Sequence, residues 1–384
     1  MGHILLCGVS ARAAAESAAH AGFDVTALDA FADRDRHPSV RACSLDRRFS
    51  ASAAADAARN ITCDAVAYLS PFENHPDAAA ALAQGRTLWG NAPEVLRRVR
   101  DPIAVEDALR RRGFPTPRVG RTGDATGQWL LKPLASGGGR RIQPWRPGDP
   151  VDDDHYLQEW IEGVPGSIVF VAAAGRACPL GVCRQLIGDA AFGATGYQYC
   201  GNILASGDAA VFEQYPALRD AACALARGVA EEFGLVGVNG VDFVARDAAP
   251  YPVEINPRWC ASMELVERAY HLGVFGAHAA ACAATTLPDF DFVHVQRVSP
   301  CAVIGKAVVF ARRAVIVGDT GMWLEETCED GAAAIRDVPH PGERIRAGRP
   351  VCTVFAAARD AQGCHAALAR RAERVYAELG VRAS

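Results

Sequence analysis

The first hundred residues alternate short apolar runs with helix-like stretches, and this alternation limits the folds open to the chain more than any other feature. Residues 4–9 predict a strand, and residues 11–21 predict a helix that ends at Gly22. Further strands are predicted at residues 25–28, 65–69 and 87–89, with a helix at 77–84. Strands that alternate with helices favour a parallel sheet covered by helices, which is an α/β architecture.

The pattern changes after residue 93 and indicates an α+β region. Two helices are expected between residues 93 and 114, broken at Asp101-Pro102, and strand signals dominate from there to about residue 207. Later elements are a helix at 216–233, a hairpin at 241–244 and 252–255, and helices at 264–284 and 364–379. Because 384 residues are too many for one ordinary core, we expect two or three domains. We set their bounds at residues 1–100, 101–293 and 294–384 on the family resemblance given below.

Charge and hydropathy exclude several classes of protein. The formal net charge is −4 with acidic and basic residues interleaved, unlike the basic surface of a nucleic-acid-binding protein. The arginines at 97, 98 and 100 and at 110–112 fall in helix-like stretches, and we interpret them as solvated helix faces. No apolar run approaches the length of a membrane span, and the N-terminus lacks the basic start of a signal peptide. We expect a cytoplasmic enzyme with no membrane or nucleic-acid partner.

The 13 cysteines are scattered along the chain and odd in number. The closest pair, Cys178 and Cys183, lacks the spacing of a zinc or redox motif. Others, such as Cys223 and Cys282, lie in apolar runs, where a free thiol packs as a small hydrophobe. We therefore expect no disulfide framework and a reducing compartment.

The first segment with chemical content joins a lysine to a glycine-rich turn. Lys132 ends an apolar run, and Gly137, Gly138 and Gly139 follow it closely. Glycines let backbone N–H groups approach phosphate oxygens, and the lysine adds a positive charge, so the segment suits a polyphosphate. Taken alone, a flexible linker with a chance lysine explains it about equally well.

The second segment is an apolar strand that ends in Gln158-Glu159-Trp160-Ile161-Glu162. The backbone edge of such a strand can pair with an adenine ring, while a carboxylate reaches the amino group or the ribose. An amphipathic strand without a ligand has the same pattern, so this segment is weak evidence by itself.

The third segment is a hairpin that gathers oxygen-bearing side chains. Asp242 lies on one predicted strand and Glu254 and Asn256 on the next, where the two-residue period places both on one face. Two carboxylates and an amide oxygen suit Mg²⁺ (or Mn²⁺) bound between nucleotide phosphates. Arg258 follows Asn256 by two residues, so the same period places it on that face. There it can hold a transferring phosphoryl group or an acyl phosphate. An ordinary surface hairpin is the alternative, but carboxylates flanked by apolar residues are costly to bury without a cation.

In order and spacing, these segments resemble the ATP-grasp superfamily over about residues 93–285. The matching features are Lys132 with its glycine turn, the hinge at 158–163, Asp242, and Glu254-x-Asn256-Pro257-Arg258. The resemblance implies an ATP-grasp fold, in which ATP lies between two α+β lobes. It also implies a Rossmann-like N-terminal α/β domain and a small C-terminal domain.

The resemblance further implies a role for each matched residue. Lys132 would contact the α- and β-phosphates, and Gly137, Gly138 and Gly139 would close over them within a lid at about residues 117–157. Glu159, Trp160 and Ile161 would meet adenine, and Glu162 would bind the ribose. Asp242, Glu254 and Asn256 would hold one or two Mg²⁺ ions, and Arg258 would act with Lys132 on the γ-phosphate or the acyl phosphate.

Two positions depart from the family pattern. Many members have a lysine after the aspartate at 101, where this chain has Pro102, so one nucleotide-binding cation is missing or supplied elsewhere. An acidic residue is common after the hinge, where this chain has Val164-Pro165-Gly166. We assign the role of the missing ribose-binding carboxylate to Glu162.

Within the superfamily, the Asn-Pro-Arg sequence and the Gln-Glu hinge resemble carboxylate–amine ligases such as the pyrrolysine-pathway ligase and tyramine–glutamate ligase. We therefore predict an ADP-forming ligase that joins a small carboxylate to an amine through an acyl phosphate. Its substrates would be amino-acid-like or cofactor precursors, and a homodimer is compatible with this class. Residues 8–12 also resemble proteins associated with one-carbon cofactor (methanopterin or methanofuran) pathways.

Two alternatives stay open. Residues 337–342 and 348–354 resemble the closing domain of biotin carboxylases, so an ATP-dependent carboxylase is the second hypothesis. Against it, carboxylases have a Glu-His pair after the Asn-x-Arg motif, and here Ser262 occupies the glutamate position while Glu264 lies two residues late. The third hypothesis is a nucleotide-binding regulatory protein with a degenerate site, for which Pro102 is the best argument.

Overall fold

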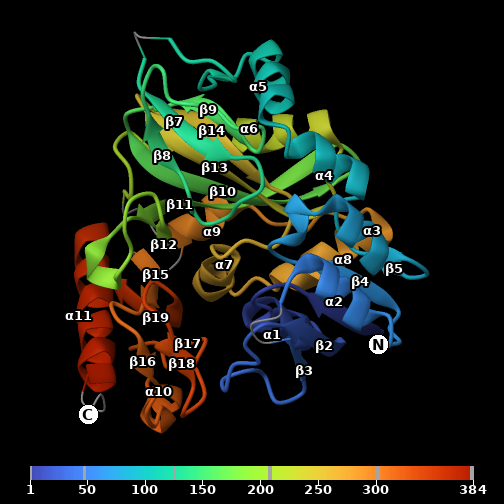
Figure 1. Cartoon of the computed structure of the whole chain (residues 1–384). Coiled ribbons are helices and arrows are strands. Elements are labelled where there is room, and N and C mark those ends of the chain that lie inside the picture. The colour runs from blue at the N-terminus through green and yellow to red at the C-terminus, as the bar shows by residue number, and fades with distance from the viewer. Residues whose placement is uncertain (1, 46–48, 125–126, 206–209, 299–302, 381–384) are drawn as a thin grey trace.

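The computed structural model describes residues 2–45, 49–124, 127–205, 210–298 and 303–380. The two termini lie at the lower end of the view in Figure 1, below the sheets of the upper lobe. Within the described residues, no helix combines the length and the apolar character that a membrane crossing needs. All cysteines in this part of the chain are free thiols, as the sequence predicts.

The N-terminal sheet is parallel, as predicted, and has the strand order β3-β2-β1-β4-β5. Leu6 of β1 lies between Ala27 of β2 and Ala67 of β4, and it is fully buried because helices cover the sheet. The elements are β1 (His3–Cys7), α1 (Arg12–His20), β2 (Asp24–Asp29), β3 (Arg41–Ser44), α2 (Ala51–Ala58), β4 (Ala65–Tyr68), the 3₁₀ turn η2 (Phe72–Asn74), α3 (Pro76–Ala83) and β5 (Thr87–Leu88).

Two short helices, α4 (Pro93–Val99) and α5 (Pro102–Arg111), lead from this sheet to the upper lobe. The break between them has a local cause. Asp101 caps α5 by accepting hydrogen bonds from the N–H groups of Ile103 and Ala104, and Pro102 occupies the first turn, where no N–H is needed.

A four-stranded antiparallel sheet, in the order β6-β9-β7-β8, lies in the upper part of the molecule in Figure 1, below α5. Its small core contains Trp129, Leu131 and Leu157. The strands are β6 (Val119–Gly120), β7 (Trp129–Pro133), β8 (Gln143–Trp145) and β9 (His155–Glu159).

An eight-stranded antiparallel sheet lies beneath it, in the order β14-β13-β10-β11-β12-β15-β19-β17. Strands from both sides of residue 294 share this sheet, because β12 pairs with β15. The strands are β10 (Val164–Ala173), β11 (Arg176–Ile187), β12 (Tyr199–Ala205), β13 (Gly237–Arg246), β14 (Ala249–Asn256), β15 (Val303–Phe310), β17 (Ile335–Arg336) and β19 (Pro350–Ala358), and β16 (Val315–Ile316) pairs separately with β18 (Arg344–Ile345).

Helices cover this sheet with apolar faces. On α6 (Tyr215–Phe233) the buried residues Leu218, Ala222, Leu225 and Val229 follow the helical period and pack against the sheet. The other elements are η3 (Ala190–Phe192), α7 (Met263–Tyr270), α8 (Val274–Ala284), α9 (Phe292–Val298), α10 (Gly321–Glu325) and α11 (Ala361–Gly380).

Three sequence-based expectations about elements need correction. The helix expected at 264–284 is two helices, α7 and α8, because His271 adopts a left-handed conformation with φ 52° and ends the first. Strand β3 was not expected, since most of its residues are exposed and it carries no apolar signal. Helix α2 was also missed, because its alanines give little contrast between two faces.

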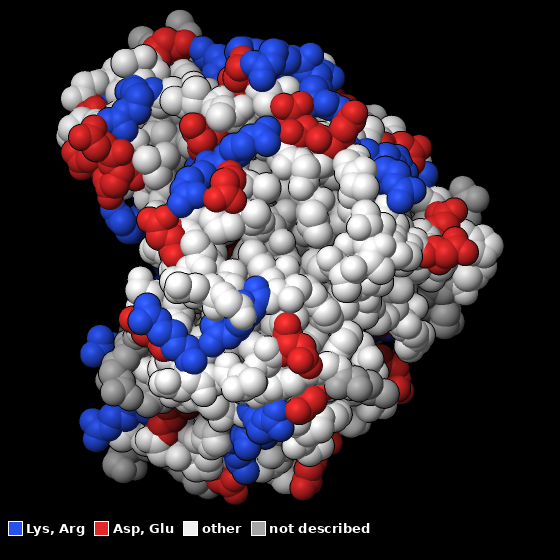
Figure 2. Space-filling view, turned by 90° about the vertical axis from the view of Figure 1, so that its right-hand side faces the viewer, with Lys and Arg blue, Asp and Glu red and all other residues white. Residues whose placement is uncertain are grey.

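The surface agrees with the charge pattern of the sequence. On the face shown in Figure 2, Lys and Arg are interspersed with Asp and Glu, and no large area of one sign appears. Arg110 and Arg111 are exposed and paired with Asp107 on α5, so this patch is a solvated helix face as expected.

Candidate functional site

A cavity of about 440 Å³ lies where residues of the four-stranded and eight-stranded sheets meet. It gathers most of the residues that the sequence singles out: Lys132, Gly138, Gly139, Glu159, Trp160, Ile161, Asp242, Glu254, Asn256 and Arg258. Gly137 lines an adjoining cavity instead. Glu162 is exposed and lines neither, so the structure does not bring it to the others.

The oxygen-bearing group is formed by the hairpin of β13 and β14. Asp242 and Glu254 are direct cross-strand partners, as the sequence predicts, and Asn256 follows two residues later on the same face. Asn256 Nδ2 donates to Asp242 Oδ2 over 3.0 Å, and Gln185 donates to the other Asp242 oxygen over 2.9 Å. The three side chains therefore converge, with hard oxygen donors of the kind that Mg²⁺ prefers.

The two carboxylates have opposite electrostatic environments. Burial, together with repulsion from Glu254, raises the pKa of Asp242 to about 7. Burial acts on Glu254 too, but Arg100 and Lys132 outweigh it and hold the pKa of Glu254 below its ordinary value. A buried pair in which one carboxylate resists ionisation gains from a cation placed between them.

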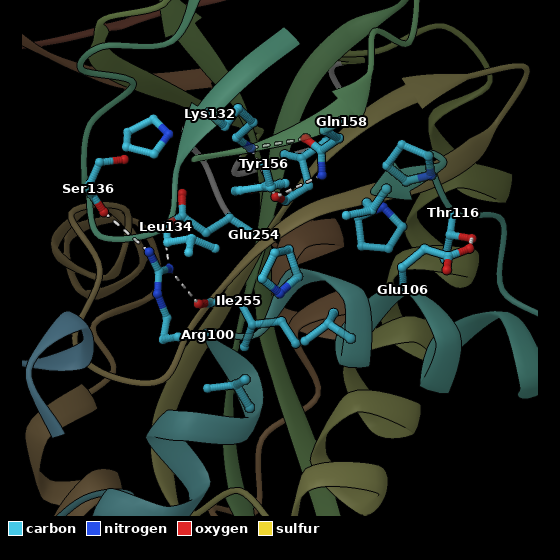
Figure 3. Close-up of a pocket in the computed structure, with 18 of the residues that line it drawn as sticks. Arg100, Glu106, Thr116, Lys132, Leu134, Ser136, Tyr156, Gln158, Glu254 and Ile255 are labelled. Carbon is cyan, nitrogen blue, oxygen red and sulfur yellow. Dashed lines mark hydrogen bonds and ion pairs between the residues drawn. The ribbon is translucent and has the colours of Figure 1, made fainter. Parts of the chain in front are cut away.

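Lys132 reaches the cavity from the end of β7, as expected. Its ammonium donates to Gln158 Oε1 over 2.9 Å and to the Val253 carbonyl over 3.3 Å, and it is 8% exposed. Figure 3 shows Lys132, Gln158 and Glu254 around a smaller space of about 60 Å³ that also borders the main cavity. Lys132 is thus a buried cation with two neutral partners, which leaves its charge available to an anion.

Arg100 is a site residue that sequence analysis missed. We interpreted it as part of a solvated helix face, and that interpretation is wrong for this residue. Its guanidinium lies 2.5 Å from Glu254 Oε1 and donates to the Ser136 carbonyl over 3.2 Å, with its side chain only 13% exposed (Figure 3). The signal that could have found it is its position two residues before Pro102, where the resemblance leaves a cation unaccounted for.

Arg258 is held by a second residue that the sequence did not single out. Its Nη2 lies 2.6 Å from Glu73 Oε1 and 3.0 Å from Asn256 Oδ1. Glu73 is fully buried on η2, directly after the end of β4 in the N-terminal sheet. The buried acid at a strand end is a signal that sequence reading could have used. Arg258 is therefore fixed beside the oxygen group, with its charge matched by a residue distant in sequence.

The glycine turn packs against the strand opposite to it. The carbonyl of Gly138 accepts a hydrogen bond from the Tyr199 N–H over 3.1 Å, and Ser136 accepts one from Asn74 Nδ2 over 3.1 Å. A Cβ on Gly139 would lie 1.8 Å from the Tyr197 carbonyl oxygen, and φ there is +72°. Only glycine permits this close approach.

The hinge residues line the end of the cavity near β9. Glu159 is paired with Arg118 at 3.2 Å, while Ile161 is buried and Trp160 is 37% exposed. Polar atoms elsewhere in the lining have no partner among the described residues: Ser167 Oγ, Asn202 Oδ1 and Arg258 Nε are all buried. Unsatisfied polar atoms around a cavity are the kind of groups that a polar ligand satisfies.

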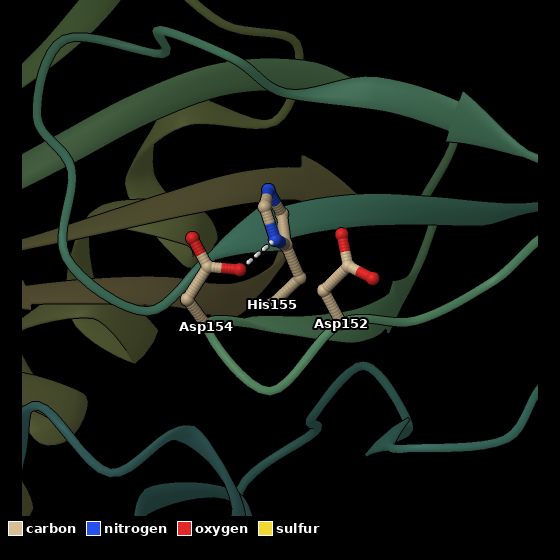
Figure 4. Close-up of side chains that lie close together, drawn as sticks. All are labelled: Asp152, Asp154 and His155. Carbon is tan, nitrogen blue, oxygen red and sulfur yellow. Dashed lines mark hydrogen bonds and ion pairs between the residues drawn. The ribbon is translucent and has the colours of Figure 1, made fainter.

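A separate cluster lies at the start of β9. Asp152, Asp154 and His155 place their ligand atoms within 4.8 Å of one another (Figure 4). Arg141 Nη2 lies 3.3 Å from both Asp154 Oδ2 and His155 Nε2, so a cation already sits in the cluster. Neither the two carboxylates nor the imidazole lines the main cavity, and we assign no metal to this cluster.

The sequence segment that forms most of this cavity matches a known family model. Residues 99–262 match the family model described as an ATP-grasp domain. This part of the chain has the ATP-grasp fold. It contains the lysine, the glycine turn, the hinge and the oxygen group described above.

Solved structures have the same fold over nearly the whole chain. An L-amino acid ligase from Bacillus licheniformis aligns with a TM-score of 0.68 and 15% identity, over 97% of this chain and 97% of that chain. A biotin carboxylase from Campylobacter jejuni, in complex with β-γ-ATP, aligns with a TM-score of 0.67 and 14% identity, over 95% of this chain and 89% of that chain. The biotin carboxylase domain of the Hydrogenobacter thermophilus 2-oxoglutarate carboxylase, a dimer with MgADP, ADP and bicarbonate, aligns with a TM-score of 0.66 and 16% identity, over 93% of this chain and 86% of that chain.

Among curated proteins, an uncharacterized protein of Methanocaldococcus jannaschii is 26% identical over 128 residues. The match spans 33% of this chain and 28% of the relative. At these levels of identity the solved structures establish the fold of the chain and nothing about its activity.

One buried ionic network beside the ATP-grasp cavity bears on the choice between ligase and carboxylase. Glu264 is bound by Arg12 at 2.7 Å and by Lys306 at 2.6 Å, and all three are buried. Ser262, at the position where carboxylases have their glutamate, lines the cavity with no charge. Glu264 is therefore committed to a structural network and does not replace that glutamate.

Proposed function

We propose that this protein is an ATP- and Mg²⁺-dependent ligase that activates a substrate carboxylate as an acyl phosphate and transfers the acyl group to an amine. The observation that carries the proposal is the convergence of Asp242, Glu254 and Asn256 beside Lys132 and Arg258 in one cavity. The proposal also rests on the ATP-grasp domain, whose relatives include an L-amino acid ligase.

The side chains of the oxygen group carry the donor atoms that a magnesium ion prefers, namely the carboxylates of Asp242 and Glu254 on paired strands and the amide of Asn256. The amide nitrogen of Asn256 faces Asp242 and its oxygen faces Arg258, so the amide would turn to offer its oxygen to the ion. Asp242, Glu254 and Asn256 would hold the ion, which would neutralise charge on the nucleotide phosphates. Glu159, Trp160 and Ile161 would border the adenine. The lid would comprise about residues 117–157, with its glycines over the phosphates.

In the first step, a carboxylate oxygen of the substrate attacks the γ-phosphorus of ATP, and the bond to the β-phosphate oxygen breaks to release ADP. Lys132 neutralises charge on the phosphates, and the glycine turn supplies backbone N–H groups. In the second step, a neutral amine attacks the acyl carbon, inorganic phosphate leaves with the bonding electrons, and the amine proton passes to phosphate or water. Arg258, held by Glu73, stabilises the tetrahedral oxyanion.

Arg100 takes the role of the cation that the family pattern lacks at Pro102. Its guanidinium already touches Glu254 and the turn that precedes the glycines, so a small movement would bring it to a phosphate. This argues against the third hypothesis, a degenerate regulatory site, because the main reason for that hypothesis was the missing cation. A homodimer remains a prediction.

The carboxylase hypothesis is supported by the folds of the Campylobacter and Hydrogenobacter carboxylases. The uncharged Ser262 and the committed Glu264 favour the ligase hypothesis over it. The deciding experiment measures ADP release from MgATP with panels of carboxylic acids and amines, and separately with bicarbonate. We expect release to depend on an acid, to be indifferent to bicarbonate, and to give a hydroxamate when hydroxylamine replaces the amine.

Glu254→Gln is expected to abolish this ADP release without loss of the fold, and the exposed Glu329→Gln is the matched control. Bicarbonate-dependent release with no hydroxamate would restore the carboxylase hypothesis. Binding of an ATP analogue without any acid-dependent turnover would favour a regulatory nucleotide-binding protein.

A further inference from the structure

A row of polar side chains on β11, β12 and β13 lines the main cavity. Gln185 of β11 donates to Asp242 of β13 over 2.9 Å, and Asn202 of β12 is the direct cross-strand partner of Gln185. The Nδ2 of Asn202 in turn donates to the hydroxyl oxygen of Tyr199 over 2.6 Å. Since directly paired residues share a face of a sheet, these four side chains form one continuous group, which we call the polar row.

Tyr199, at the far end of the polar row, also contacts the glycine turn. Its backbone N–H donates to the carbonyl of Gly138 over 3.1 Å, and both residues line the main cavity. The polar row therefore joins the two groups that are proposed to enclose the nucleotide phosphates, with the magnesium-binding Asp242 at one end and the glycine turn at the other. A phosphoryl group held between these two groups lies beside the polar row.

The Tyr199 end of the polar row has polar atoms without partners. The hydroxyl oxygen of Tyr199 accepts from Asn202, but its hydrogen has no acceptor among the residues that the structure describes. Asn202 is 2% exposed, and its Oδ1 likewise has no partner there. Because an unsatisfied buried donor is costly, a free hydroxyl hydrogen in a cavity lining indicates a ligand that accepts a hydrogen bond.

The Tyr199 hydroxyl remains protonated at neutral pH. Burial raises the pKa of Tyr199 well above its ordinary value, and the nearby Asp242 adds to the effect. A cation on the same face of the sheet, Lys306, is the cross-strand partner of Asn202, but Glu264 binds its ammonium at 2.6 Å. Tyr199 is therefore a neutral donor that is free for an anionic oxygen, whereas the charge of Lys306 is already matched.

We propose that Tyr199 is a catalytic residue whose hydroxyl donates a hydrogen bond to an oxygen of the transferring γ-phosphoryl group, and that Asn202 is the positioning residue that orients this hydroxyl. The inference rests on the proposed function. As the carboxylate oxygen bonds to the γ-phosphorus and the bond to ADP breaks, the outer phosphoryl oxygens stay negatively charged, and a fixed donor beside them lowers the barrier. The hydroxyl proton stays on Tyr199 throughout. Because the contact is strongest in the transition state, it raises kcat more than it strengthens ATP binding.

The test compares Tyr199→Phe with the unmodified protein. Phenylalanine keeps the ring and the backbone N–H that binds Gly138, and it removes only the hydroxyl. One assay measures, by calorimetry, the affinity for MgADP alone and for MgADP with aluminium fluoride, which mimics the transferring phosphoryl group. A second assay measures kcat of ADP release from MgATP with the panel of carboxylic acids and hydroxylamine.

We expect MgADP alone to bind the variant and the unmodified protein equally. Tyr199→Phe is expected to lose roughly 10- to 100-fold in affinity for MgADP with aluminium fluoride and a similar factor in kcat, as for one hydrogen bond to a charged group. Asn202→Ala is expected to lower kcat in the unmodified protein but not in the Tyr199→Phe background, because it acts through the hydroxyl.

Tyr215→Phe is the matched control. Tyr215 is also buried, and its hydroxyl also accepts from an amide, that of Gln296, over 3.0 Å. It does not line the main cavity, so both affinities and kcat should stay unchanged in this variant.

The inference is overturned if Tyr199→Phe binds MgADP with aluminium fluoride as tightly as the unmodified protein does. It is also overturned if the affinity for MgADP alone falls by the same factor, or if the melting temperature falls while kcat does not, since Tyr199 would then act only in nucleotide binding or packing. ADP release that depends on bicarbonate and not on an acid would instead contradict the ligase function. The aluminium fluoride assay still tests Tyr199 in that case, because both reactions begin with phosphoryl transfer from ATP.

Discussion

Gly139→Ala is the perturbation whose effect follows most directly from the geometry of the glycine turn. An added Cβ would lie 1.8 Å from the Tyr197 carbonyl oxygen, a backbone atom that cannot rotate away. Restoring ordinary contact requires the turn to withdraw by about 1.5 Å, which separates Gly138 from Tyr199. Misplacement of catalytic groups by about 1 Å can cost 100-fold in rate. We expect kcat/KM for ATP to fall roughly 10- to 100-fold, or about 1.4–2.7 kcal/mol.

Gly138→Ala is the matched control for this variant. Both glycines have positive φ, +65° at Gly138 and +72° at Gly139, so alanine costs a similar ~1–2 kcal/mol of backbone strain at each. A Cβ on Gly138 would have no atom within 4 Å, so only strain is expected there. The assays are ADP release against ATP concentration and calorimetric affinity for a non-hydrolysable ATP analogue. Equal losses in the two variants would refute the argument that close approach to Tyr197, and not strain alone, requires glycine.

Three further predictions concern charged residues: Arg100 and Glu73 of the site, and Glu267, which contacts Ser17 of α1. Arg100→Met should weaken binding of an ATP analogue by about 1.5–3 kcal/mol in calorimetry, with Arg100→Lys retaining part of the affinity; unchanged affinity would remove Arg100 from the phosphate site. Glu73→Gln leaves the buried Arg258 charge without its partner and should lower the free energy of unfolding by about 3 kcal/mol in urea titrations, whereas a loss under about 1 kcal/mol would show the pair to be dispensable. Burial raises the pKa of Glu267 from 4.5 to about 7, so the folded state retains a proton that the unfolded chain releases, and this group makes stability fall as pH rises from 4.5 to 7. Glu267→Gln should remove this dependence, up to about 1.4 kcal/mol per pH unit, and an unchanged slope between pH 5 and pH 8 would contradict it.

Sequence patterns predicted the elements whose periodicity is local. The alternation before residue 93 gave a parallel sheet, and the two-residue period of the hairpin placed Asp242 opposite Glu254. The lysine and the glycine turn were recognisable because each residue type has a conformational or electrostatic reason to be there. These parts of the site are encoded within short segments.

The rest of the site depends on contacts between distant segments. Arg100 belongs to an arginine-rich stretch at the end of α4, and only the approach of β14 turns its side chain toward Glu254. Glu73 reaches Arg258 across 185 residues of sequence. Whether a charged side chain at a helix end or in a loop is solvated or belongs to a site can therefore be decided only from the tertiary structure.

Oxygen transfer from a labelled carboxylate tests the acyl-phosphate claim most directly. The acid that stimulates ADP release is prepared with ¹⁸O in its carboxylate, and the inorganic phosphate formed in the presence of amine is analysed by mass spectrometry. Attack of the carboxylate on the γ-phosphorus, followed by cleavage of the acyl carbon–oxygen bond, predicts one ¹⁸O atom in each phosphate. Phosphate that carries no label from the acid, or that takes its label from ¹⁸O-bicarbonate instead, would contradict the account.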